Sequence, residues 1–267
     1  LWLAQRLGVG FRFHWKPLAS ETPGRSLPPA KAVFDADFIQ ACHRPLADFR
    51  AALRPVETSL ARSALTDAVR APHCRGIVTE HVGPGLQLDG VPATPAEHRD
   101  AWQRIGWSRR LRELEMRARE AVPERSTALH IRRGDIVYGQ LRRKHWPGKF
   151  RPFAWLRRVA EDLCASGVTV VVFGDSPATV DTLCAGLPAL RADRLRPADT
   201  SGFEAAFFEL CALAATDRIV GSKSVYSSVA AMVGGTGFEL VEQLIPADLQ
   251  ASLVIEDLAS CPDHYDR

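Results

Sequence analysis

The stretch Val168-Thr169-Val170-Val171-Val172-Phe173-Gly174-Asp175-Ser176-Pro177 decides the fold. Its nearly unbroken run of β-branched residues is typical of a strand buried on both faces, as in the centre of a parallel sheet. Gly174 to Ser176 are typical turn residues, and Pro177 suits the first turn of a helix. A buried strand that turns directly into a helix indicates an α/β domain.

The order strand, turn, helix recurs on both sides of this stretch. Before it, we expect a strand at 127–131, a basic loop at 133–150 and a helix from Pro152 to Ser166. After it, the expected elements are helices at 177–185 and 202–215, a strand at 218–220, a helix at 225–233 and a strand at 238–241. Residues 126–242 therefore predict a parallel, doubly wound sheet.

The first half of the chain has a less regular pattern. Leu1 to Leu7 are typical of the second half of an amphipathic helix ending at Gly8, so we expect a preceding strand and loop outside this sequence. Further expected elements are a strand at 9–15, helices at 35–41 and 58–70, a strand at 76–80 and a charged helix at 107–121. We expect two domains, an acceptor-side domain at 1–122 and a donor-nucleotide domain at 123–267.

Composition excludes several classes of protein. The net charge of +3 over 267 residues is too small for general nucleic-acid binding. No run reaches the ~18 apolar residues of a membrane span, so we expect no integral membrane segment. The six cysteines form no Cys-x-x-Cys pair. Reduced thiols, no zinc site and a cytoplasmic location are expected.

Polar segments follow three of the predicted strands, beginning at Arg132, Gly174 and Gly221. The carboxyl ends of parallel strands share one edge of the sheet, where such folds bind ligands. Arg132 and Arg133 carry planar guanidinium groups that pair bidentately with phosphate oxygens. One arginine can take a diphosphate while Asp135 holds the other. The alternative is a surface ion-pair cluster at an ordinary strand end.

The segment Ala128-Leu129-His130-Ile131-Arg132-Arg133-Gly134-Asp135 resembles the His-Val-Arg-Arg-Gly-Asp signature of α1,2-fucosyltransferases. It is similar to the pattern of α1,6-fucosyltransferases, including the Nod-factor enzymes. The likeness covers about 125–235, with an aromatic helix start at Phe153, the Phe173–Pro177 turn, an acidic-aromatic helix at 204–214 and a Ser-rich segment at 216–231.

The resemblance implies a GT-B-like α/β fold, with two Rossmann-type doubly wound domains facing a cleft. It implies an inverting transfer of fucose from GDP-fucose to a glycan hydroxyl, with a bacterial polysaccharide or lipo-oligosaccharide as acceptor. No metal or other cofactor is expected, because family members without metal ions use the arginine to neutralise the leaving group. The absence of an Asp-x-Asp motif fits this expectation.

The resemblance also assigns roles at the predicted site. Arg132 and Arg133 are expected to hold the β-phosphate, with Arg132 the more important and catalytic, and His130 to face the guanine or ribose. Asp175 is expected to accept from guanine N1–H and N2–H₂. Two further residues are expected to bind the phosphates: Ser222 and Ser224. They lie at a strand-to-helix turn, where hydroxyls and free backbone N–H groups suit phosphate oxygens. For Asp175 and Ser224, the alternative is a helix cap.

A catalytic base is harder to assign. The sequence departs from the α1,6 pattern, since Ile136 and Gln140 stand where that pattern has a lysine and a glutamate. Asp135 is the catalytic candidate, although it can instead buttress an arginine. The weaker candidates are Glu80 and His81. The basic loop 142–149 can close over the donor, meet the acceptor or simply be solvated.

Three alternative functions stay open. The chain can be a GT-B transferase for another nucleotide sugar. It can also be a degenerate nucleotide-sugar-binding module, because the base is not evident and the family's N-terminal Gly-rich loop is not in the sequence. The third alternative is an unrelated phosphate-binding α/β domain.

Overall fold

The computed structural model describes residues 1–8, 10–18, 26–50, 53–55, 59–60, 76–78, 87–133, 150–200 and 202–246. By its internal contacts the chain forms two compact units. Unit 1 is Leu1–Glu113 with Gly202–Glu204, and unit 2 is Leu114–Ser201 with Ala205–Arg267. Both units combine helices with parallel strands, which confirms the predicted α/β class.

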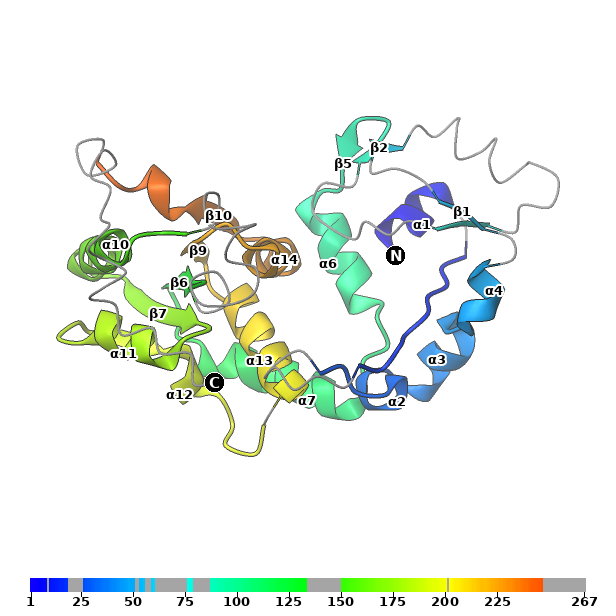
Figure 1. Cartoon of the computed structure of the whole chain (residues 1–267), viewed down its shortest axis with the longest axis horizontal. Helices are drawn as coiled ribbons and strands as arrows, with labels where there is room; N and C mark the ends of the chain where they lie inside the picture. The colour runs from blue at the N-terminus through cyan, green and yellow to red at the C-terminus, as the bar shows by residue number, and fades with distance from the viewer. Residues whose placement is uncertain are drawn as a thin grey trace. The chain divides into compact units, whose positions relative to one another are not determined.

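Unit 2 is built on a five-stranded parallel sheet with the order β10-β9-β6-β7-β8 (Figure 1). Its strands are β6 (Ser126–Ile131), β7 (Thr169–Gly174), β8 (Ala189–Arg191), β9 (Arg218–Gly221) and β10 (Gly237–Leu240). From β6 the chain adds β7 and β8 on one side, then crosses over to add β9 and β10 on the other. This reversal beside β6 confirms the predicted doubly wound sheet and creates a topological switch point between β6 and β9.

Helices cover both faces of this sheet (Figure 1). The helices α10 (Phe153–Ala165) and α11 (Pro177–Cys184) lie on one face, and α13 (Gly202–Ala214) and α14 (Val225–Gly234) lie on the other. The prediction missed β8 and the short helix α12 (Ala192–Leu195). Neither element is long enough to show a periodic pattern, and β8 has no buried residue.

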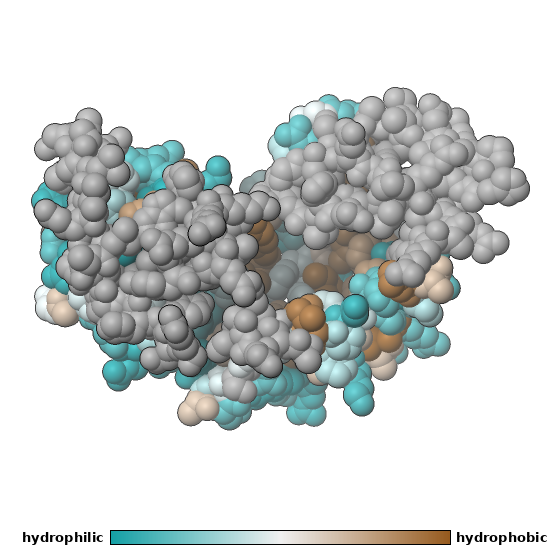
Figure 2. All heavy atoms as spheres, in the orientation of Figure 1, coloured by the Kyte–Doolittle hydropathy of each residue, from teal (hydrophilic) through white to brown (hydrophobic). Residues whose placement is uncertain are grey.

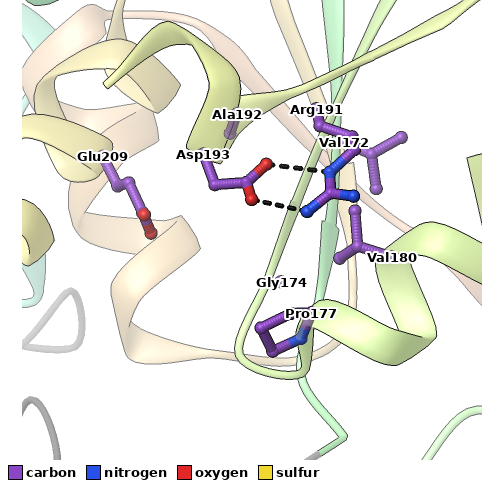
Figure 3. Close-up of a pocket in the computed structure, with 8 residues that line it drawn as sticks. All are labelled: Val172, Gly174, Pro177, Val180, Arg191, Ala192, Asp193 and Glu209. Carbon is purple, nitrogen blue, oxygen red and sulfur yellow. Dashed lines mark hydrogen bonds and ion pairs between the residues drawn. The ribbon is translucent and has the colours of Figure 1, made fainter. Parts of the chain in front are cut away.

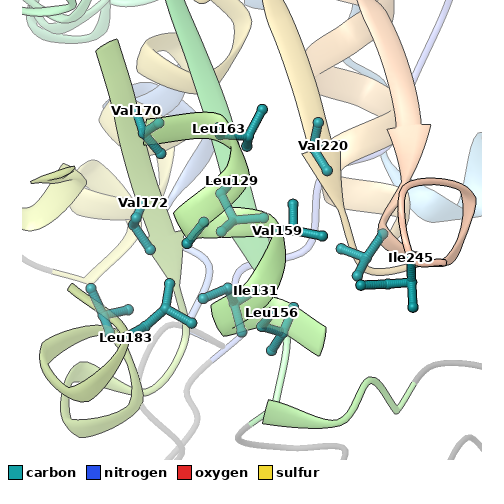
Figure 4. Packing of buried hydrophobic residues seen from close by; sticks show 13 residues of the cluster. Leu129, Ile131, Leu156, Val159, Leu163, Val170, Val172, Leu183, Val220 and Ile245 are labelled. Carbon is teal, nitrogen blue, oxygen red and sulfur yellow. The ribbon is translucent and has the colours of Figure 1, made fainter. Parts of the chain in front are cut away.

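The core on the α10 face shows why these residues form these elements (Figure 4). Alternate residues of β6, Leu129 and Ile131, point into it, as do Val170 and Val172 of β7. They pack against one stripe of α10: Leu156, Val159, Ala160 and Leu163. Complete burial of such a side chain stabilises the fold by about 1.5–3 kcal/mol. The core therefore fixes the strand ends that carry the candidate site.

Unit 1 contains shorter elements. Its helices are α1 (Trp2–Leu7), α2 (Ala30–Val33), α3 (Ala36–Cys42), α4 (Leu46–Arg50) and α6 (Pro95–Gln103), and α7 (Arg109–Ala121) contributes to both units. Its strands are β1 (Leu53–Pro55), β2 (Ser59–Leu60), β3 (Gly76–Val78), β4 (Gln87–Leu88) and β5 (Val91–Pro92). The pairs β1–β3 and β2–β4 are parallel, and β4–β5 is antiparallel. The predicted helix end at Gly8 is confirmed by its left-handed backbone, with φ of 66°.

Three predictions for the first half need correction. The strand at 9–15 is wrong, because Phe13 makes only an isolated bridge to His43 within the described residues. Its ring packs instead on the ring of Phe34, with the centroids 5.0 Å apart. The helix predicted at 58–70 is wrong at 59–60, which form β2, and the rest of that range lies outside the described residues. The helix α6 was missed, although Thr94 and Glu97 form a capping box that signals its start.

The other first-half predictions agree with the described residues. The helix predicted at 35–41 is α3, whose first turn is capped by Asp35 through a 2.8 Å bond from Phe38 N–H. The strand predicted at 76–80 is confirmed over β3, and the charged helix at 107–121 is confirmed as α7. That helix begins later than predicted, because Trp107 forms a bridge with Phe34.

The described surface in Figure 2 is mostly hydrophilic, with hydrophobic residues confined to smaller areas. Exposed large hydrophobic side chains are spread over several elements: Leu18, Leu46, Val91, Met116, Val168, Leu190 and Val225. None of the helices in the described part of the chain is long and apolar enough to cross a membrane.

Candidate functional site

The candidate site lies at the carboxyl ends of β6, β7 and β9. The parallel register pairs His130 of β6 with Phe173 of β7 and with Gly221 of β9. The residues that follow these strands therefore leave the sheet at one edge, beside the switch point. This edge brings together the segments 132–133, 174–176 and 222–224, as the sequence predicted.

Asp175 bridges two of these strand ends. Its carboxylate accepts a 2.9 Å hydrogen bond from the backbone N–H of Arg133. The alternative assignment of Asp175 as the cap of α11 is wrong, because Ser176 is the N-cap and accepts from the backbone N–H of Thr179. Asp175 is exposed, so its carboxylate lies at the edge where a ligand can reach it.

The two arginines of the signature differ sharply in exposure. Arg132 is partly exposed, whereas Arg133 has no exposed surface. The guanidinium of Arg133 donates a 2.7 Å bond to the carbonyl of Arg151 and lies 5.0 Å from the ring centre of Phe150. The predicted contact of Arg133 with a phosphate stays a prediction, and it would require this side chain to leave both partners. Arg132 is the better placed of the two.

His130 lies buried beneath the site. Its Nδ1 is 2.6 Å from the hydroxyl of Ser227, and its ring stacks on Tyr226 with the centroids 5.6 Å apart. Burial, followed by the positive charge of Arg132, lowers the pKa of His130 to about 4. The imidazole is therefore neutral at pH 7. Ser227 is also fully buried, so this Ser–His pair is not a solvent-accessible nucleophile. The predicted contact of His130 with guanine or ribose stays a prediction.

The turn between β9 and α14 adds polar groups at the switch point. Ser222 is fully buried, and its hydroxyl has no hydrogen-bond partner among the described residues. Ser224 caps α14 by accepting a 3.2 Å bond from the N–H of Tyr226, which confirms the capping alternative. Its phosphate role, like that of Ser222, stays a prediction.

Lys223 is the residue of this turn that sequence reasoning missed. It is exposed, and within the described part of the chain no hydrogen bond or ion pair to its ammonium is observed. The register of His130 with Gly221 continues through the bond from Ser222 N–H to the His130 carbonyl. Lys223 lies two residues after the end of β9, and Arg132 lies one residue after the end of the neighbouring strand β6. The position of Lys223 between Ser222 and Ser224 was the sequence feature that could have indicated it as a site residue.

A small cavity opens next to the Asp175 turn (Figure 3). It is lined by Val172, Gly174, Pro177, Val180, Arg191, Ala192, Asp193 and Glu209. Arg191 holds Asp193 through bonds of 2.9 and 2.5 Å. Burial raises the pKa of Glu209, against the charge of Arg196, whose guanidinium is 3.0 Å away. Sequence reasoning missed Asp193 because it did not predict α12, and it predicted the helix that carries Glu209 without assigning that residue to a site.

Several predicted residues lie outside the described part of the chain. These are the candidate bases Asp135, Glu80 and His81, and the basic loop 142–149. Among the described residues, no group of three metal-ligating side chains lies together. The absence of a cofactor stays a prediction.

Comparisons with known proteins find likeness in structure alone. No family model matches the chain, and no curated protein matches it. POFUT1 in complex with GDP is 12% identical, with a TM-score of 0.45 over 89% of this chain and 91% of that chain. The fucosyltransferase NodZ from Bradyrhizobium is 13% identical, with a TM-score of 0.47 over 85% and 84%. POFUT1 in complex with GDP-fucose is 11% identical, with a TM-score of 0.44 over 89% and 91%.

Proposed function

We propose that the chain is an inverting glycosyltransferase that moves fucose from GDP-fucose to a glycan hydroxyl. One observation carries the proposal. Arg132, within the fucosyltransferase-like signature, and Lys223 follow two neighbouring parallel strands at the switch point of a doubly wound sheet. Two cations at this position are suited to an anionic ligand, and the N-terminus of α14 adds a favourable dipole.

The diphosphate would lie between these two strand ends. The guanidinium of Arg132 would pair with the β-phosphate, and the ammonium of Lys223 would neutralise a further oxygen. The N-terminal N–H groups of α14 and the unpartnered hydroxyl of Ser222 would complete the cradle. The positive charges of Arg132 and Lys223 would then lie where negative charge develops as the diphosphate leaves.

The nucleobase would lie toward β7. A carboxylate can accept both N1–H and N2–H₂ of guanine, which adenine does not offer as a pair. Asp175 is exposed directly after the end of β7, where its carboxylate could meet the base. The Asp175 carboxylate would therefore favour guanine over adenine.

The reaction would proceed by direct displacement. The acceptor oxygen forms a bond to the anomeric carbon of fucose, and the bond from that carbon to the β-phosphate oxygen breaks. GDP leaves with the electron pair, stabilised by Arg132 and Lys223 without a metal ion. The acceptor proton passes to a base, for which Asp135 is the proposed residue. A bacterial polysaccharide or lipo-oligosaccharide is the proposed acceptor.

Binding and turnover together test this function. Calorimetric titrations should show binding of GDP and GDP-fucose, weaker binding of ADP and none of UDP. Incubation of GDP-fucose with a panel of oligosaccharide acceptors should release GDP and yield a fucosylated product. Binding of UDP-sugars alone would overturn the guanine assignment. GDP binding with no turnover across the panel would favour a degenerate nucleotide-sugar-binding protein.

A further inference from the structure

Arg133 is the largest fully buried side chain in the described part of the chain. A buried guanidinium is costly unless polar partners replace water. Its Nη1 donates a 2.7 Å bond to the carbonyl of Arg151, and its Cζ lies 5.0 Å from the ring centre of Phe150. Two consecutive residues therefore hold this side chain.

All three guanidinium nitrogens of Arg151 donate hydrogen bonds. Its Nε donates a 2.6 Å bond to Glu242, and Nη2 donates to the other oxygen of the same carboxylate. Its Nη1 donates a 2.7 Å bond to the carbonyl of Phe150. The Arg151 side chain is only 10% exposed and that of Glu242 is 30% exposed, so water screens this bidentate pair weakly. The pair thus fixes the backbone of both residues that hold Arg133.

These contacts connect two distant parts of unit 2 at the candidate site. Glu242 belongs to η1 (Val241–Gln243), which follows β10. Arg133 directly follows Arg132 at the end of β6, and its backbone N–H is bound by Asp175 at the end of β7. Glu242 therefore contacts Arg151, and Arg151 in turn contacts Arg133, the residue next to Arg132.

We propose that Arg133, Arg151 and Glu242 form a positioning network that holds Arg132 in the orientation required for the diphosphate. Arg133 is then a positioning residue, and Arg132 is the residue that meets the ligand. The proposal rests on the proposed function, because the ligand tested is GDP. Its physical basis is preorganisation, since a cation fixed before binding loses less conformational freedom on binding.

The test uses the whole chain and two sets of variants. Glu242→Gln removes the charge but keeps the shape. The double variant Arg151→Met with Glu242→Met replaces the pair by apolar groups, which need not lower stability. Glu239→Gln is the matched control, because it breaks the bidentate Arg218–Glu239 pair, with bonds of 2.9 and 2.6 Å, away from the site. The measurements are hydrogen exchange of the Arg133 amide without ligand, the Kd for GDP and the melting temperature.

Both network variants should speed exchange of the Arg133 amide and raise the Kd for GDP about tenfold. The double variant should do so with a melting temperature close to that of the wild type, which a purely structural role would not produce. Glu239→Gln should change neither exchange nor affinity. Unchanged Arg133 exchange in both network variants would overturn the proposal. If the wild type does not bind GDP, but hydrogen exchange at the Arg133 amide is still faster in the network variants, the network is supported and the proposed ligand is rejected.

Discussion

The carboxylate of Asp175 accepts a 2.9 Å hydrogen bond from the backbone N–H of Arg133, across the carboxyl ends of β7 and β6. One side chain thus joins the strand end proposed to bind the nucleobase to the strand end proposed to bind the diphosphate. Because the donor is a backbone group, this bond is independent of the Arg133 side chain. It allows the structural and ligand-binding roles of Asp175 to be separated by substitution.

Asp175→Asn is expected to weaken GDP binding about tenfold with little change in melting temperature. The amide oxygen can still accept from Arg133, but one guanine N–H loses its acceptor. Asp175→Ala should lower both affinity and melting temperature. Calorimetry with GDP and inosine diphosphate, which lacks the N2 amino group, measures the effect. Wild-type affinity for GDP in Asp175→Asn would instead assign base recognition to other groups, such as those of the neighbouring cavity.

Protonation of His130 should make the fold less stable in acid. Its pKa is lowered to about 4, so between pH 6.5 and 4 the unfolded chain binds a proton that the folded chain excludes. Stability from this residue is present above pH 6.5 and is lost as the pH falls toward 4, by up to about 3 kcal/mol. Urea unfolding of the wild type and His130→Gln at pH 7.0, 5.5 and 4.5 measures the difference. Parallel pH profiles for the two proteins would contradict the burial of a neutral imidazole.

Gly221 allows the close approach of β9 to β6. A Cβ at this position would lie 2.8 Å from the carbonyl oxygen of His130, so the two strands would have to shift. Gly221→Ala is expected to cost about 1–3 kcal/mol of unfolding free energy. Gly237→Ala in β10 is the matched control, since its Cβ would meet no atom within 4 Å. Equal unfolding midpoints for the two variants would refute this account of the strand contact.

Lys223→Met tests the cation that the sequence pattern did not reveal. The exposed ammonium should contribute to GDP affinity and not to folding, so we expect about a tenfold higher Kd and an unchanged melting temperature. The affinity of the variant should also depend less on salt, because one charge contact with phosphate is lost. Lys31→Met, at an exposed lysine of α2, is the control. A salt dependence identical to that of the wild type would remove Lys223 from the site.

The sequence predicted unit 2 well for physical reasons. Short buried runs such as those of β6 and β7 are typical of strands inside a sheet, and the order of turns and helices then brings Arg132, Asp175 and Ser222 to one edge. What failed depended on tertiary contacts. The alternation around Phe13 was typical of a strand, but the ring of Phe13 packs on the ring of Phe34 and the segment does not pair as a strand. The burial of Arg133 depends on Arg151 and Glu242, which no local pattern connects to it.

The central claim is that the switch point of unit 2 binds a nucleoside diphosphate through Arg132. Calorimetric titration of GDP into the wild type, Arg132→Ala and Arg158→Ala tests it most directly. Arg158 is an exposed arginine of α10 paired with Asp162 at 2.9 Å, so its loss controls for general charge. The account predicts that Arg132→Ala loses about 10- to 100-fold in affinity while Arg158→Ala keeps that of the wild type. Equal GDP affinity in all three proteins would contradict the claim.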